Sequence, residues 1–451
     1  MTKEETKNWI KFLPFRDVVL WDVKRYASEK IKSDYPIVKL GLHIQEQSQK
    51  VKLFDFPEKE FGILGVNNKI GIFDAYKEKG ANINQAYKRM EIGWLAYNPY
   101  RVNVGSIGMR TNEHENEFIS PAYVVFNCKE TLLPDFLYKL FKTERFNKII
   151  NESTTGSVRQ NLTIDILKSL DIPMPPTSVQ KTLLENYYKK VNLANNTDNE
   201  IEIVKIQIEN LVINQLGVKK QAKSIAKKGL NFISYKSITR WALSYLTNLK
   251  SYSLDEVKFK IVPLKNVLAF FEGGKTPSTA NKAYWNGNIC WTSPKDFNGF
   301  EIHDSEDKIT DLAVKDGMKV FPEGTLLGVF RSGILRHSFP VAITHIPTAI
   351  NQDLKAMDVK SELIDKNYFL IYLHTFQKMI LEMASKVGVT VESINSDEFL
   401  DIPIVLPPIK FQEQLVNEVN FLKNKVEKMQ IVAEQNKSEA IKEFEQAIFK
   451  I

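Results

Sequence analysis

The feature that most constrains this 451-residue chain is an internal repeat with a spacing of 232 residues. A glycine, a Pro-Pro pair and a glutamine keep this spacing, at Gly156 and Gly388, at Pro175-Pro176 and Pro407-Pro408, and at Gln180 and Gln412. Weaker similarities extend the repeat upstream, from Leu40 to Leu264 and from Ile119 to Ile350. Because this period is far longer than that of solenoid repeats, it indicates a duplicated domain.

Each Pro-Pro pair is followed by a long amphipathic pattern. In 178–216 and 410–450, apolar residues recur every three or four positions among charged and polar ones, which predicts two long helices. Gly217 is a stop signal for the first helix, and the polar run 195–199 is a candidate break within it. A 40-residue helix spans about 60 Å. A helix of that length with one apolar stripe needs a partner, and the other helix is the simplest one.

The chain is therefore predicted to alternate domain and helix. The expected boundaries are a first domain at 1–176, a first helix at 177–217, a linker and second domain at 218–408, and a second helix at 409–451. Strand patterns at 122–126 and 325–330 and helical patterns at 133–150 and 368–386 give each domain an α+β fold. Antiparallel helices would relate the two domains by approximate two-fold symmetry. The basic stretch 219–228 is interpreted as an exposed linker, with phosphate contacts as the alternative.

Composition excludes several classes of protein. Cys128 and Cys290 form no CxxC or Cys/His cluster, which excludes a disulfide framework and a zinc finger. No stretch has the roughly 18 uninterrupted apolar residues that a membrane span needs, and the polar start MTKEE is unlike a secretion signal. The formal net charge of +7 suits a polyanionic partner but does not require one. We expect a cytoplasmic protein without a membrane partner.

Two motifs resemble those of nucleotide-dependent enzymes but are incomplete. Gly273-Gly274-Lys275-Thr276 resembles the end of a phosphate-binding P-loop, but that motif needs a glycine where this chain has Ala269. Pro277 also follows at the point where the helix of the motif begins. Asn98-Pro99-Tyr100 resembles the base-binding motif of adenine methyltransferases but lacks the second proline and has no FxGxG partner. We interpret it as a turn at the end of a strand.

Hydrolytic chemistry is also poorly supported. Asp296, Glu306 and Lys308 have a spacing compatible with a metal-dependent nuclease, but the neighbouring Asp304 and Asp307 indicate a solvated loop. The six histidines are scattered along the sequence, and no Ser/His/Asp or Cys/His arrangement is evident. We therefore predict a chain without a catalytic centre and without a metal site.

The remaining candidates are loop residues that suit DNA. Basic and polar side chains can bind phosphates or base edges, and glycines allow close backbone approach. The candidates are Gly273, Gly274, Lys275, Thr276, Ser278, Lys282, Lys295, Arg331 and Arg336 in the second domain, and Arg101, Arg110, Arg159 and Gln160 in the first. We expect Trp285 and Trp291 to pack beneath the 273–282 loop. Any single candidate fits a solvated surface equally well, but two sets on duplicated domains favour DNA.

These motifs resemble a known family. GGKTPSTANKAYWNGNICWTSPKDF at 273–297 resembles the opening of a target recognition domain in the specificity subunits of type I restriction-modification systems. INQD at 350–353 and the 388–412 block resemble later motifs of that family, in the same order. DIPMPPTSVQ at 171–180 and DIPIVLPPIKFQEQLVNEV at 401–419 resemble the entries into its two spacer helices. The first domain departs from the pattern, with Glu46-Gln47-Ser48-Gln49 roughly where Gly-Gly-x-Thr-Pro-Ser is expected.

The resemblance implies a DNA-recognition subunit that is not itself an enzyme. Each target recognition domain would read half of an asymmetric, bipartite double-stranded DNA site in the major groove, and the spacer helices would set the gap between the halves. Methyltransferase (modification) subunits would bind the helices and supply S-adenosylmethionine binding and N6-adenine methylation. Restriction (translocase) subunits would supply ATP- and Mg-dependent translocation and cleavage. No cofactor is expected on this chain.

Three alternatives remain at this stage. The chain could be the recognition subunit of a type II system whose partner combines methyltransferase and nuclease. It could be a coiled-coil scaffold whose domains bind protein, which would show no sequence preference for DNA and little salt dependence. It could also be a stand-alone nuclease, which would cleave DNA by itself in the presence of metal.

Overall fold

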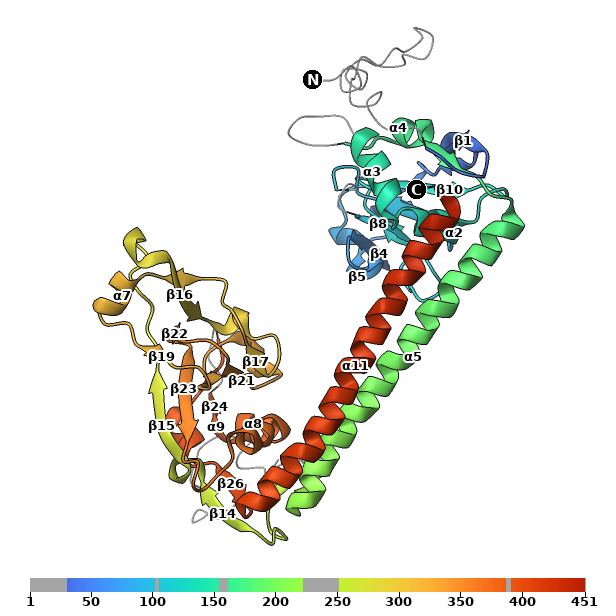
Figure 1. Ribbon diagram of the computed structural model, residues 1–451. Helices are drawn as coiled ribbons and strands as arrows, with labels where there is room; N and C mark the ends of the chain where they lie inside the picture. Colours follow the sequence, from blue (N-terminus) through green and yellow to red (C-terminus); the bar gives the residue numbers. More distant parts are fainter. Residues whose placement is uncertain (1–30, 102–104, 154–160, 222–250, 387–390, 451) are drawn as a thin grey trace, which may run out of the picture. The chain divides into compact units, whose positions relative to one another are not determined.

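A computed structural model describes residues 31–101, 105–153, 161–221, 251–386 and 391–450. Contacts divide the chain into two units. Unit 1 comprises Met1–Asn199 with Gln430–Ile451, and unit 2 comprises Glu200–Met429. Both units contain sheets and helices (Figure 1), as the predicted α+β class requires.

Unit 1 is built on two antiparallel-rich sheets. Four strands form the order β2-β10-β7-β8, at Ile44–Glu46, Val124–Cys128, Leu95–Tyr97 and Ile107–Met109. Five form β3-β6-β9-β4-β5, at Lys50–Val51, Tyr87–Arg89, Phe118–Ile119, Glu60–Asn67 and Gly71–Lys79. Strands β1 (Ile37–Lys39) and β11 (Asp171–Pro173) form a separate pair. The shorter helices are α2 (Pro134–Leu140), α3 (Glu144–Ser153) and α4 (Ile164–Ser169). The core contains fully buried aromatic side chains, including Tyr97, Phe126 and Phe136.

Unit 2 has a related but larger set of elements. Five strands form the order β15-β23-β20-β21-β17, at Leu268–Gly273, Leu354–Val359, Leu326–Val329, Val341–Thr344 and Glu301–Ile302. Four form β18-β16-β22-β19, at Lys308–Ile309, Trp285–Thr292, Thr348–Ile350 and Val320–Phe321. Three further pairs of strands are present. They are β14 (Lys260–Pro263) with β26 (Pro403–Leu406), β12 (Lys219–Lys220) with β13 (Tyr252–Ser253), and β24 (Ser385–Lys386) with β25 (Ser393–Ile394). The shorter helices are α7 Asp311–Lys315, α8 Lys366–Thr375, α9 Gln377–Ala384 and α10 Ser396–Leu400.

The sequence repeat is also a structural repeat. The elements β1, β2, β7, β9, β10, α2, α3, α4 and β11 of unit 1 recur in the same order as β14, β15, β20, β22, β23, α8, α9, α10 and β26 of unit 2. The long helices α5 (Thr177–Leu216) and α11 (Ile409–Ile448) each have 40 residues and begin 232 positions apart. The similarity of Leu40 to Leu264 is real, because their N–H groups donate to Leu170 O and Ile402 O at 2.8 and 2.9 Å. Gly156 and Gly388 lie outside the described residues.

The repeated glutamines join each long helix to its domain. Both side chains are fully buried, and each amide donates to the carbonyl of the first proline in its Pro-Pro pair. Each amide oxygen also accepts from a backbone N–H at the start of a domain helix. The bonds of Gln180 are to Pro175 O (2.8 Å) and Leu133 N (2.9 Å), and those of Gln412 are to Pro407 O (2.7 Å) and Asp365 N (2.8 Å). We call each of these arrangements a glutamine joint.

Replacing Gln412 with leucine is expected to lower the free energy of unfolding by about 2–4 kcal/mol, because the partly buried N–H of Asp365 and the buried carbonyl of Pro407 lose their partners. Urea denaturation followed by circular dichroism measures this loss. Gln414→Leu is the matched control, since Gln414 is exposed on the same helix turn. Equal destabilisation by both substitutions would contradict a structural role for the glutamine joint.

In unit 1, the first half of α5 packs against the second half of α11 (Figure 1). Lys190 Nζ pairs with Glu439 at 2.8 Å and with Glu443 at 2.7 Å, and Lys437 Nζ pairs with Asp198 at 2.9 Å. Positions further along α5 thus contact positions further back along α11. The two helices therefore run antiparallel within this unit.

Unit 2 shows the same direction of pairing. Ile201 and Val204 of α5 form a buried cluster with Val426 of α11. Further along α5, Gln215 Nε2 donates to Glu418 at 2.7 Å. Gly217 then ends α5 with a positive φ of 72°, and Val218 N donates to Ile213 O at 3.0 Å, so the predicted glycine stop is confirmed.

The candidate break at 195–199 does not occur, since α5 is continuous through it. Ala194 is buried, whereas the asparagines at 195, 196 and 199 are exposed and do not interrupt the packed face. Thr197 Oγ1 donates back to Leu193 O within the helix at 3.0 Å. The three asparagines thus face solvent, Asp198 pairs with Lys437 of α11, and the polar run does not end the helix.

The predicted helices at 133–150 and 368–386 are each two helices. The first is divided between α2 and α3, where Thr143 Oγ1 donates to Leu140 O at 2.7 Å and accepts from Phe146 N. The second is divided between α8 and α9 at Phe376, which is fully buried. Side-chain hydrogen bonding and tertiary packing decide both breaks, and neither leaves a periodicity signal.

Part of the predicted linker is a strand. Lys219 and Lys220 form β12 and pair with Ser253 and Tyr252 of β13, and Lys220 also pairs with Glu209 at 3.0 Å. The lysines at 223, 227 and 228 lie outside the described residues. Within the described part of the chain, none of the helices is both long enough and apolar enough to cross a membrane.

Candidate nucleic-acid interface

The 273–278 loop follows strand β15 and runs close against β22. A Cβ atom at Gly274 would lie 2.1 Å from Ile350 O and 2.3 Å from Asn351 O, so only glycine fits there. Lys275 N donates to Ile350 O at 3.0 Å and fixes the course of the loop. Gly274 thus has a structural reason to be glycine, and the side chains that follow it, at Lys275, Thr276 and Ser278, are exposed.

Two tryptophans support this loop from below, as predicted. Trp285 Nε1 donates to Ser278 O and Trp291 Nε1 donates to Lys275 O, both at 3.2 Å. Their rings pack edge to face with centroids 5.1 Å apart. The indoles are therefore engaged by the protein, and the loop presents its basic and hydroxyl side chains outward.

A second exposed segment follows strand β20. Arg331 is 63% exposed and lies 4.0 Å from the Asp353 carboxylate, while its N–H donates to Asp353 O at 3.2 Å. Arg336 is 58% exposed, and its Nε donates to Glu392 at 2.5 Å. This hydrogen bond holds the pKa of Glu392 below its ordinary value. Arg336 therefore has a carboxylate partner that DNA would have to share or displace, whereas the guanidinium of Arg331 is more open.

The INQD segment, 350–353, lies between these two loops and contacts both. Gln352 Oε1 accepts from Thr276 Oγ1 on one side, and Asp353 O accepts from Arg331 N on the other. Asn351 is buried, and its amide donates to Asp353 Oδ2 at 3.1 Å. Residues predicted from separate parts of the sequence are thus brought together around one segment. We call the exposed Lys275, Thr276, Arg331 and Gln352 the unit 2 surface.

Sequence reasoning missed two members of this region. Gln352 was visible only as part of the INQD motif and was not assigned a contact. Lys355 pairs with Gly273 across β15 and β23, and its Nζ lies 5.4 Å from the centroid of the Phe271 ring. No local sequence signal distinguishes this lysine from others on strands.

Two other predicted cations differ in their surroundings. Lys282 is exposed in a short 3₁₀ turn, Lys282–Tyr284. Lys295 pairs with Glu306 at 3.1 Å and Asp307 at 2.9 Å, which weakens its case as a phosphate contact. These ion pairs raise the pKa of Lys295 above its ordinary value.

The acidic residues near Lys295 have structural partners as well. Asp296 Oδ2 accepts from Ser293 N at 2.8 Å in a capping box, and Lys308 pairs with Asp304 at 3.0 Å. The loop interpretation of the nuclease-like spacing is consistent with these contacts.

Unit 1 offers one exposed candidate, Arg101, in the equivalent segment. The segments that follow β7 and β20 are tied down alike, by Leu162 N to Pro99 O at 2.9 Å and by Ile394 N to Phe330 O at 2.8 Å. Arg101 lies two residues after the first of these carbonyls, and Arg331 lies one residue after the second. The Asn98-Pro99-Tyr100 motif is a turn, as predicted, because Arg101 N donates to Asn98 O at 3.1 Å.

The other first-domain candidates are less favourable or outside the described residues. Arg110 is half-buried, and its Nη1 donates to Met90 O at 2.5 Å, which gives the guanidinium an internal partner without DNA. Arg159 and Gln160 lie outside the described residues. In place of the glycine motif, unit 1 has Gln47, whose amide donates to Asn127 Oδ1 at 3.0 Å.

Comparison with known proteins identifies the class of domain. Residues 256–443 match the family model described as the type I restriction modification DNA specificity domain. The chain is 34% identical over 174 residues to the specificity subunit of the type I restriction enzyme EcoR124I/EcoR124II of Escherichia coli, covering 38% of this chain and 42% of that protein. It is 29% identical over 160 residues to the type I restriction enzyme MjaIX specificity subunit of Methanocaldococcus jannaschii, covering 34% and 36%. The predicted resemblance to type I specificity subunits is therefore confirmed.

These relationships differ in extent. The chain spans about two fifths of the length of the curated relatives it matches. A solved chain from a study of complex assembly and conformational transition of the type I restriction-modification system aligns over 93% of this chain and 98% of its own length. Its TM-score is 0.58 at 12% sequence identity, so this likeness concerns the fold.

Proposed function

We propose that this chain is the DNA-specificity subunit of a type I restriction-modification complex and binds a bipartite double-stranded DNA site, with one half read by each unit. The observation that carries this proposal is the unit 2 surface, in which exposed cationic and amide side chains gather within the segment that matches a DNA specificity domain. Arg and Gln side chains are well suited to paired hydrogen bonds with base edges in the major groove. Arg101 lies in the equivalent segment of unit 1, after β7.

The long helices would act as the spacer between the two half-sites. Their 40-residue length, their antiparallel contacts within each unit and the glutamine joints at their starts support this role. A spacer of fixed length selects a fixed number of base pairs between halves, as dimer geometry does for other DNA-binding proteins. In this proposal the repeat relates the two target recognition domains by approximate two-fold symmetry.

Methyl transfer and DNA cleavage would belong to partner subunits. Methyltransferase subunits would supply S-adenosylmethionine binding, and restriction subunits would supply ATP- and Mg-dependent work. The incomplete P-loop at Gly274 and the incomplete methyltransferase motif at Asn98 support this division, because each has a structural explanation in this chain. The chain itself would contribute recognition and assembly.

Exposed apolar side chains on the long helices are the surface that we propose for the methyltransferase subunits. In unit 2, Phe421 is 73% exposed and lines a groove of about 450 Å³ with Leu211 and Leu422. Ile203 and Ile206 are also exposed on α5 in this unit. Large apolar side chains exposed on a helix are typical of protein interaction sites.

Phe421→Asp is expected to weaken methyltransferase-subunit binding by at least about tenfold, because it places a carboxylate where the bound subunit would cover an apolar ring. Binding is measured by isothermal titration calorimetry with the purified subunit. Asn424→Asp adds the same charge at an exposed position of the same helix and should bind as the unsubstituted chain does. Equal binding by both variants would rule out this face as the docking site.

The proposed function is tested by co-expressing the chain with the methyltransferase subunit of a type I system from the same genome. The host should lack other adenine methylation, and its DNA is sequenced for N6-methyladenine. We expect methylation at a split motif with a fixed gap. A stable complex that methylates no motif would refute the assignment, and the absence of a complex together with salt-insensitive, sequence-independent binding would favour a scaffold.

A further inference from the structure

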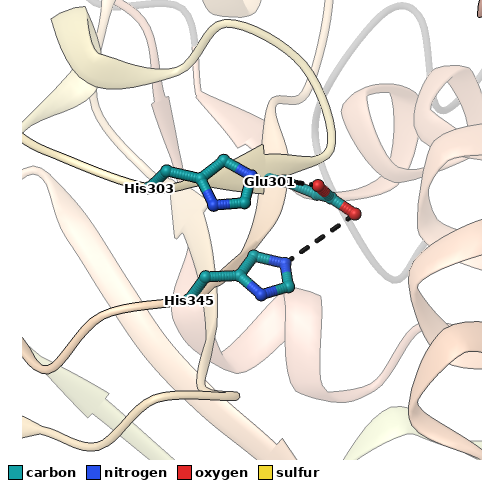
Figure 2. A group of neighbouring side chains, drawn as sticks. All are labelled: Glu301, His303 and His345. Carbon is teal, nitrogen blue, oxygen red and sulfur yellow. Dashed lines mark hydrogen bonds and ion pairs between the residues drawn. The ribbon is translucent and has the colours of Figure 1, made fainter.

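Glu301, His303 and His345 form a cluster at one edge of the β15-β23-β20-β21-β17 sheet (Figure 2). Strand β17 pairs in parallel with β21, so that Glu301 lies beside Ile343 and Ile302 beside Thr344. His345 N then donates to Ile302 O at 2.8 Å, which continues the pairing beyond both strands. The histidines are therefore neighbours across the pair, and Glu301 is on the same face as His303, two residues earlier.

The three side chains lie close together. His303 Nε2 lies 3.1 Å from Glu301 Oε2, and His345 Nε2 lies 3.7 Å from Glu301 Oε1. The imidazole rings are stacked, with centroids 4.5 Å apart and planes inclined by 15°. All three residues are exposed, so an ion and its water ligands can reach them.

The potential ligand atoms of the three residues all lie within 4.8 Å of one another, so that small rotations of the exposed side chains would bring them around one metal ion. Bonds from Zn²⁺ to imidazole nitrogen and carboxylate oxygen are about 2.0–2.2 Å long, which places tetrahedral ligand atoms about 3.3 Å apart. Two histidines and one carboxylate bind divalent transition metals and leave further positions for water. We propose that Glu301, His303 and His345 bind a divalent transition-metal ion of the Zn²⁺ and Co²⁺ class.

The neighbouring Lys423 competes with such an ion. Its Nζ lies 3.6 Å from the centroid of the Phe300 ring and is attracted to the Glu301 carboxylate. Burial lowers the pKa of Lys423 to about 8, and the attraction to Glu301 offsets part of that effect. Removing the positive charge of Lys423 should therefore strengthen metal binding at this cluster. If the metal bound elsewhere in the chain, the same substitution would leave its affinity unchanged.

The bound ion would fasten the edge of the sheet. Strand β17 has only two residues, and β21 is its one partner among the strands of the described residues. A metal bond to residues from both strand ends would hold this short strand in place. Binding to the folded chain would then raise its thermal midpoint.

The test uses the untagged full chain, stripped of metal with a chelator. Co²⁺ is titrated and followed by its visible absorption, and Zn²⁺ binding is measured by calorimetry. We expect one equivalent to bind, affinity to fall at least about tenfold in His303→Gln and in His345→Gln, and affinity to rise in Lys423→Gln. His337→Gln is the matched control, since His337 is exposed in the same unit but outside the cluster. Absence of saturable binding, or an equal loss in the control, would overturn the proposal.

Discussion

Inserting four residues into each long helix is expected to lengthen the gap between the two half-sites by one to two base pairs. Four helical residues add about 6 Å of length and about 40° of rotation. One base pair adds about 3.4 Å and about 34–36°. The rotation added by the insertion corresponds to one base pair, and the added length corresponds to about two. The gap is therefore expected to grow by one to two base pairs.

The insertions belong at facing positions, after Asn199 in α5 and after Ala433 in α11. Asp198 pairs with Lys437 at this level of the helix pair, so insertion on both sides preserves antiparallel pairing beyond it. The measurement is sequencing of N6-methyladenine sites made by the reconstituted complex. A control variant replaces four exposed residues at the same level without changing helix length. An altered chain that methylates a split motif with the original gap would refute the spacer role.

Arg331→Ala is expected to reduce recognition of one half-site while leaving the other intact. A bidentate arginine contact to a base contributes about 1–3 kcal/mol, so affinity for the intact site should fall about fivefold to 150-fold. Because Arg331 is 63% exposed and has only a 4.0 Å contact with Asp353, the thermal midpoint should barely change. Competition binding with duplexes altered in either half measures which preference is lost.

Arg101→Ala supplies the reciprocal control, because it should affect the opposite half-site. The salt dependence of binding then distinguishes the two kinds of contact. Loss of a base contact relaxes sequence preference at one position, whereas loss of a phosphate contact weakens all sequences alike and lowers the salt slope by about one. If either substitution abolished both preferences together, independent reading by the two units would be wrong.

The architecture was largely predictable because duplication left two copies of each signal. The Pro-Pro pairs mark both helix starts, and Gly217 marks the end of α5. The repeat also predicted that Leu40 and Leu264 occupy equivalent positions. The helix breaks at Thr143 and Phe376 were not predictable, since they depend on a side-chain hydrogen bond and on burial.

The site was only partly predictable. The residue types in the 273–278 loop indicated nucleic acid, but its approach to Gln352 depends on strand pairing across more than 70 residues. Arg110 and Arg101 look alike in the sequence, and only the structure reveals that Arg110 has a partner at Met90 O. The histidines at 303 and 345 look scattered in the sequence, and only the parallel pairing of β17 with β21 brings them together.

The glutamine joints have a mechanical consequence. A single flexible connection would let a domain swivel about the end of its helix, so that helix length controlled distance alone. Gln180 and Gln412 instead bond the first turn of each helix to its own domain on two sides. If the helix pair acts as the proposed spacer, its torsion would therefore be transmitted to the domains, and the angular phase of the two half-sites around the duplex would be selected as strictly as their separation.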